Sequence, residues 1–210
     1  MDICEELHRI LNNSRRHYFP FDEALIPRNG IYCLYEKGES GHGTDRVVRV
    51  GTHTGRNQLR SRLKQHFLKQ NKDRSIFRKN IGRAYLNSIK DSFLGQWEYD
   101  LTSTKNRKIY ISMVDLKRLE EIEAIVSNYI QKHFSFVVIE VPDKELRLRY
   151  ESRLISTISI CKTCSPSENW FGLYSPKSKI RESGLWLVNE LYKEAFSVEE
   201  YKKFKYVLQN

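Results

Sequence analysis

The sequence predicts an α+β fold in which a small, three-stranded, mostly antiparallel sheet is flanked by helices. Residues 31–35 and 46–50 are rich in β-forming side chains and lie close together, and a third apolar run covers 134–141. Other apolar residues recur at helical spacing. The order of strand, strand, helix, insertion, strand, helix and tail is typical of a small mixed domain.

The first 26 residues are expected to form a short amphipathic helix, over 3–12, and a linker. A glycine-rich segment at 37–43 predicts a turn between the first two strands, which makes a hairpin the simplest arrangement. The next apolar stripe predicts a helix over 57–69.

The main domain is expected to cover residues 27–172, with an insertion at about 71–133 that contains helices. Its last strand, 134–141, is followed by Asp143, a suitable N-cap for a helix over 144–159. Residues 173–210 are expected to form a helical C-terminal extension.

The chain has an excess of positive charge, with 36 Lys and Arg against 26 Asp and Glu and a formal net charge of +10. This balance suits a nucleic-acid partner, because each neutralised phosphate releases condensed counterions. No apolar stretch approaches the roughly 18 residues of a membrane span, and no signal peptide is recognisable. We therefore expect a cytoplasmic protein that does not bind membranes.

Four cysteines are spread along the chain, and only Cys161 and Cys164 are close in sequence. A structural zinc site needs a second pair of cysteines, or two histidines, at a matching spacing. The sequence shows neither, so this pair is expected to have no metal role.

Glu151 is distinguished by its neighbours on the predicted helix. The residues at i−3, i+3, i+4 and i+7 are all apolar, so its carboxylate lies in the middle of an apolar face: Leu148, Leu154, Ile155 and Ile158. A charge in such a place needs a metal, a catalytic role or a buried ion pair to offset its desolvation.

Arg62 and His66 are spaced i, i+4 on the helix predicted over 57–69, at the edge of its buried face. An arginine suits a fixed phosphate, because its planar guanidinium is always charged and donates in pairs. Taken alone, however, the two residues are better explained as a surface arginine and a boundary histidine.

The polar residues form an ordered set along the predicted elements: Gly30-Ile31-Tyr32, Arg49-Val50-Gly51-Thr52, Arg62, His66, Glu151 and Asn169. This set resembles the GIY-YIG nuclease superfamily, over residues 27–70 and 134–172. The resemblance implies the fold described above and a metal-dependent endonuclease whose substrate is DNA, most simply double-stranded.

The resemblance also implies a role for each residue. Glu151 would be the protein ligand of Mg²⁺ or Mn²⁺, with phosphate oxygens and waters filling the other positions. Tyr32 would be the general base or position the attacking water, and His66 would orient Tyr32 or relay its proton. Arg62 would clamp the phosphate. Asn169 would hold the site by hydrogen bonds.

Arg49 departs from the family pattern, which has a tyrosine at this position. An arginine is never deprotonated in proteins, so it cannot act as a base. Its charge could favour the phenolate of Tyr32, or the change could mark a site that binds nucleic acid without cutting it. A nuclease for RNA or branched DNA is a further alternative.

Basic residues in the helix after Gly51, in the insertion and in the tail are candidates for contact with nucleic acid. Those in the tail lie near aromatic residues, a mixture that suits nucleic acid. The candidates are Arg60, Lys64, Lys69, Arg78, Lys79, Lys177, Lys179 and Arg181.

Overall fold

In a computed structural model of the chain, which describes residues 2–209, four strands form one antiparallel sheet in the order β1-β4-β2-β3. The strands are β1 (His17–Tyr18), β2 (Gly30–Gly41), β3 (Thr44–Gly51) and β4 (Phe134–Glu140). The α+β class is confirmed, but the expected number of three strands was wrong. The added strand, β1, lies in the predicted linker and is only two residues long, too short for an alternating pattern to be recognised.

The hairpin of β2 and β3 is longer than its glycine content suggested. Strand pairing continues to Gly41 and Thr44, so the turn is confined to His42 and Gly43, which have positive φ angles of 52° and 71°. The register shifts between Tyr35 and Ser40. A bulge of this kind lets a strand bend without ending, and so the glycine-rich segment remains in the sheet.

The helices predicted over 3–12, 57–69 and 144–159 are present as α1, α2 and α7, and the insertion contains four helices, α3 to α6. These helices are α1 (Ile3–Asn12), α2 (Leu59–Phe67), α3 (Ile76–Ser88), α4 (Leu94–Trp97), α5 (Thr104–Tyr110), α6 (Leu116–His133) and α7 (Lys144–Ser159). The side chain of Asp143 accepts a hydrogen bond from the Leu146 amide and caps α7, as predicted.

The tail contains α8 (Ser178–Ser183) and α9 (Val198–Gln209), and short 3₁₀ turns occur at Glu23–Leu25, Ile111–Met113 and Phe171–Tyr174. Ser197 and Glu200 exchange hydrogen bonds between side chain and backbone, which forms a capping box at the start of α9. No helix in the described residues has both the length and the apolar character of a membrane span.

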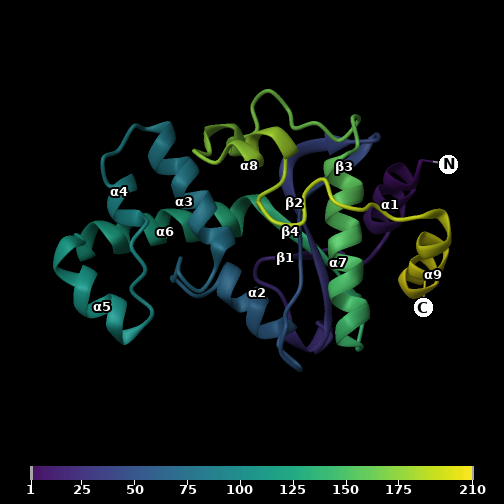
Figure 1. Cartoon of the computed structure of the whole chain (residues 1–210), viewed down its shortest axis with the longest axis horizontal. Helices are drawn as coiled ribbons and strands as arrows, with labels where there is room; N and C mark the ends of the chain where they lie inside the picture. Colours follow the sequence, from purple (N-terminus) through teal and green to yellow (C-terminus); the bar gives the residue numbers. More distant parts are fainter. Residues whose placement is uncertain (1, 210) are drawn as a thin grey trace.

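Two hydrophobic cores lie on the two faces of the sheet. Tyr32 and Leu34 of β2 face a core shared with α2, α3 and α6, whereas Ile31 and Cys33 face a core shared with α1, α7 and α9. Figure 1 shows α7, α1 and α9 gathered on one side, while the insertion from α3 to α6 extends away from the other. The tail contributes to both cores, through Trp186 to the first and through Phe204 to the second.

After α8, the chain runs along the outer edge of β3; we call residues 185–190 the edge segment. The Trp186 amide donates a 2.7 Å hydrogen bond to the carbonyl of Val48. The Trp186 indole donates to the buried carboxylate of Glu36, which also accepts from Trp170 and from the hydroxyl of Tyr129. These bonds fix the edge segment beside the site described next.

Candidate active site

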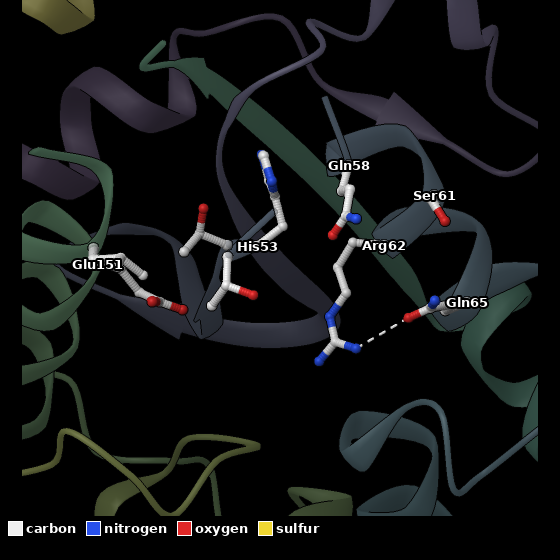
Figure 2. A pocket seen from close by; sticks show the side chains of 9 residues that line it. His53, Gln58, Ser61, Arg62, Gln65 and Glu151 are labelled. Atoms are coloured by element: carbon white, nitrogen blue, oxygen red, sulfur yellow. Dashed lines mark hydrogen bonds between the residues drawn. The ribbon is translucent and has the colours of Figure 1, made fainter. Parts of the chain in front are cut away.

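A cavity of about 390 Å³ opens beyond the end of β3, between α2 and α7. Arg62 comes from α2 and Glu151 from α7, and residues 52–54, directly after β3, lie between them (Figure 2). Because α2 and α7 cover opposite faces of the sheet, only an edge of the sheet allows their side chains to line one cavity. Gln58, Ser61 and Gln65 also line the cavity, and Leu148 is its one apolar lining residue.

Glu151 is half-buried at the rim of the apolar face of α7 and points into this cavity (Figure 2). Burial raises the pKa of its carboxyl group, and the charge of Arg49, a hydrogen bond from the Thr52 amide and the charge of Arg62 oppose that rise. Its helix neighbours Arg149 and Arg153 pair with other carboxylates, and no salt bridge of the described residues includes Glu151. The carboxylate therefore faces the cavity without a paired cation.

A second cavity, of about 290 Å³, adjoins the first, since Arg62 and Glu151 line both. Arg49, Asn80, Asn189 and Glu190 complete its polar lining, and Glu190 is paired with Lys193. Arg49 Nε and Asn80 Nδ2 are buried and have no hydrogen-bond partner. Buried donors without partners are costly, so this wall is suited to accept an anion.

Tyr32, His66 and Ser75 form a buried hydrogen-bonded chain near Arg62 and Arg49, which line the cavities. The Tyr32 hydroxyl lies 2.7 Å from His66 Nε2, and His66 Nδ1 lies 2.7 Å from Ser75 Oγ. Burial, with the nearby charges of Arg62, Arg49 and Arg78, holds the pKa of His66 well below its usual value. The ring is therefore neutral, with one donor and one acceptor, and can pass a proton between the two hydroxyls.

Tyr32 is fully buried, and its ring lies across Gly51, its pairing partner on β3. A Cβ atom at Gly51 would overlap the tyrosine hydroxyl and ring. The last residue of β3 must therefore be glycine for Tyr32 to reach His66.

Arg49 lies inside the candidate site, although it replaces the second signature tyrosine. It is buried, donates a hydrogen bond to the carbonyl of Trp186, and interacts electrostatically with both His66 and Glu151. The substitution thus adds a fixed positive charge to the site.

Three of the six core candidates line the cavities, namely Arg49, Arg62 and Glu151, whereas Tyr32 and His66 are buried beside them and Asn169 lies apart. Asn169 is exposed and lines neither cavity to which Glu151 contributes. Asn189, from the edge segment, occupies the wall instead. Sequence reasoning missed Asn189 because the tail was treated as an extension, and it missed Asn80 because that residue lies in the insertion.

The basic candidates separate into paired and exposed residues. Arg78 is fully buried in an ion pair with Glu123, and Lys79 is buried in an ion pair with Asp73, so both side chains already have partners within the fold. Glu123 is 45 residues from Arg78 in sequence, which hid that pairing. Three others have partners within the fold. Lys64 pairs with Glu23, and Arg60 and Arg181 donate hydrogen bonds to backbone carbonyls. Three side chains remain exposed: Lys69, Lys177 and Lys179.

The fold is an α+β domain. Its candidate site places the buried, unpartnered donors of Arg49 and Asn80 in the same cavity as Glu151, a carboxylate without a salt bridge. Comparison with protein families gives a match to the GIY-YIG domain over residues 2–210. The chain therefore belongs to the GIY-YIG family, which is a family of nucleases. No curated protein and no solved structure matches the chain.

Proposed function

We propose that the chain is a divalent-metal-dependent endonuclease that hydrolyses phosphodiester bonds of double-stranded DNA between α2 and α7. The observation that carries the proposal is the Glu151 carboxylate, which has no salt-bridge partner and faces Arg62 across one cavity (Figure 2). A carboxylate without a salt bridge and a guanidinium that line one cavity suit a metal ion and the phosphate bound to it.

The residues present fit Mg²⁺ or Mn²⁺. Magnesium is usually held by one or two carboxylates together with substrate phosphates and waters, and Glu151 with an open, polar cavity meets that requirement. When bound, the ion would polarise the phosphate and make a bound water more acidic. Glu151 would hold it.

Arg62 and the wall next to it would bind the phosphate. Arg62 Nη1 donates to the side chain of Gln65, at 3.1 Å, and to the carbonyl of Arg74, at 3.0 Å. These bonds fix the guanidinium before substrate arrives, which is how a preorganised group stabilises developing charge. The unpartnered donors of Arg49 and Asn80, with the side chain of Asn189, supply further contacts for phosphate oxygens.

We assign Tyr32 as the general base or water-positioning group, with His66 as the acceptor of its proton. Burial and the nearby charges of Arg62 and Arg49 keep His66 neutral, so its Nε2 can accept a hydrogen bond from the Tyr32 hydroxyl. Because Tyr32 is fully buried, this role requires a water to enter beside Gly51 when the substrate binds.

A plasmid-nicking assay with Mg²⁺ or Mn²⁺ tests the proposal. Glu151→Gln and Arg62→Ala are each expected to lower the rate by about 10²-fold or more, the usual effect of removing a group that stabilises the transition state. Glu145→Gln, at an exposed glutamate on the same helix, is the matched control and should nick like the wild type. Equal, negligible nicking by all four proteins at matched folding contradicts the proposal.

Arg49 favours a second candidate function, a module of the same fold that binds nucleic acid without cutting it. This second function would be supported if the wild type binds DNA without added metal and does not nick the plasmid. The same variants, tested on single-stranded DNA, branched DNA and RNA, define the substrate class.

A further inference from the structure

A second cluster of metal-binding side chains lies at the other end of the β2–β3 hairpin, away from Gly51 and the cavities. It brings together Cys4 and His8 of α1, His42 of the hairpin turn, and Cys164 of the loop after α7. Their potential ligand atoms all lie within 4.8 Å of one another. Cys161 lies in the same loop and forms a second group with His42 and Asp2; its thiol interacts with the thiol of Cys4 and with the imidazole of His42.

Two of the distances between these side chains match those between the ligands of a tetrahedral zinc ion. The sulfurs of Cys4 and Cys164 are 3.5 Å apart, and Cys161 Sγ is 3.4 Å from His42 Nε2. Zinc bonds of about 2.3 Å to sulfur and 2.0 Å to nitrogen, at tetrahedral angles, separate ligand atoms by roughly 3.5–3.8 Å. Magnesium and calcium prefer oxygen ligands, so a set of thiols and imidazoles points to zinc.

His8 is a weaker ligand than Cys161, although it lies in the cluster. Its Nδ1 is 2.9 Å from the carbonyl of Cys4, to which it can only donate, so the free electron pair belongs to Nε2. That nitrogen accepts a 3.2 Å hydrogen bond from the Val47 amide. His8 is thus satisfied by the backbone, whereas Cys161 and Cys164 have the Cys-x-x-Cys spacing of structural zinc sites.

The surroundings of His42 also suit a ligand. Thr163 Oγ1 lies 3.3 Å from His42 Nδ1, 3.2 Å from His42 Nε2 and 3.1 Å from Cys161 Sγ. With Nε2 bound to the metal, a hydrogen bond from Nδ1 to this hydroxyl would fix the orientation of the ligating ring. Thr163 lies between the two cysteines of the loop, so one residue can orient the histidine and support the loop.

We infer that the chain contains a structural zinc site in which Cys4, His42, Cys161 and Cys164 bind one Zn²⁺, separate from the catalytic metal. The three thiols would release their protons to solvent on binding. Four protein ligands leave no open position, so the site would be structural. It would tie the N-terminal helix and the loop after α7 to the hairpin turn, three segments that lie far apart in sequence. The proposal departs from the expectation that Cys161 and Cys164 have no metal role, because the fold brings Cys4 and His42 beside their loop.

The metal content of the full-length chain, purified under reducing conditions without chelators, tests the site. We expect about one zinc ion per chain by elemental analysis, and less than about a tenth of that in Cys4→Ala or Cys164→Ala. Cys33→Ala is the matched control, since Cys33 is also a buried free cysteine but lies in β2 outside the cluster. Glu151→Gln should keep its zinc, which separates this site from the proposed catalytic metal.

Cobalt substitution gives a readout that does not depend on unstable variants. Co²⁺ in the wild-type chain should show tetrahedral d–d bands and a thiolate charge-transfer band, and Cys161→Ala, at a half-buried position, should weaken that band by about a third. A zinc-free wild-type chain, or one with a Cys4–Cys164 disulfide, would overturn the site. An unchanged charge-transfer band in Cys161→Ala would overturn Cys161 as the fourth ligand.

Discussion

The ring of Tyr32 lies across Gly51, and no side chain can occupy Gly51 while Tyr32 is in place. The two residues are paired in register on neighbouring strands, so the contact is built into the hairpin. It directs the tyrosine hydroxyl to His66. The glycine of the second signature motif is therefore required by a close approach, with no need for an unusual backbone angle.

Gly51→Ala is expected to force Tyr32 away from His66. The added methyl group should lower the free energy of unfolding by about 1–3 kcal/mol, as overpacking does, and should reduce nicking as well. Urea denaturation measures the first effect. Gly95→Ala is the control, since a Cβ there meets nothing within 4 Å. Equal stability of the Gly51 variant and the wild type would show that Tyr32 can move freely.

Glu151→Gln is expected to stabilise the metal-free chain while it abolishes nicking. Burial raises the pKa of Glu151, so folding favours the protonated carboxyl, and stability is lost as pH rises from the ordinary glutamate range through the raised pKa. Glutamine carries no such cost. In EDTA near neutral pH, the variant should be more stable by on the order of 1 kcal/mol.

The stability difference between Glu151→Gln and the wild type should disappear below about pH 4, where both side chains are neutral. Denaturant titrations across pH test this. Glu36, whose pKa is also raised by burial, is present in both proteins and cancels from the difference. A difference that does not depend on pH would mean that desolvation of Glu151 is not its cause.

His66 gives the opposite pH dependence. Its pKa is lowered by burial and by nearby arginines, so its stabilising contribution is present above about pH 6.5 and is lost as pH falls towards the lowered value. We expect the wild type to lose up to about 1.4 kcal/mol per pH unit below that point through this residue. His66→Gln should show a shallower decline. Parallel curves would contradict a buried, neutral His66.

The two asparagines are distinguished by their positions. Asn189→Ala should reduce the nicking rate by roughly 10-fold or more, because it removes one hydrogen-bonding group from the cavity wall. Asn169→Ala should cut at nearly the wild-type rate, since Asn169 is exposed and lines neither cavity. If Asn169→Ala slowed nicking and Asn189→Ala did not, Asn169 rather than Asn189 would belong to the active site.

The exposed lysines of the tail are expected to contribute to DNA affinity. Lys177→Ala with Lys179→Ala should weaken duplex binding for all sequences and reduce the slope of log affinity against log salt by about 1–2. Fluorescence anisotropy at several salt concentrations measures this. An unchanged slope would place the DNA path elsewhere.

Arg78→Ala provides the contrast, because its expected effect is on folding. Removing one partner of a buried ion pair costs about 3–5 kcal/mol, so this variant should lose most of its stability. A folded Arg78 variant with weakened DNA binding would contradict the buried position.

The residues that the sequence located are those whose neighbours on the same element define them. Arg62 and His66 lie one helical turn apart, and Glu151 lies within a local apolar pattern. The residues that it missed depend on contacts between distant segments. Arg78 pairs with Glu123, 45 residues away, and no spacing within a helix predicts that pairing.

The same holds for Asn189 and for the proposed zinc ligands. Asn189 reaches the cavity because the amide of Trp186 donates a hydrogen bond to the carbonyl of Val48 on β3. These two residues are 138 positions apart in the sequence, so no local periodicity predicts the contact. Cys4 and Cys164 are separated by 160 residues and meet only because α1 packs beside α7. Local patterns therefore predicted the fold class and the centre of the candidate site, and missed the parts that the tail and the N-terminal helix complete.

The hydrogen bond between Trp186 and Val48 also limits how two copies of the chain could assemble. A bare edge strand invites pairing with another sheet, but at Val48 the carbonyl of β3 is already occupied by the edge segment. A second copy cannot extend the sheet along this part of β3 unless the tail first detaches, which would also withdraw Asn189. Dimers formed to cut both strands of a duplex should therefore not pair through this part of β3.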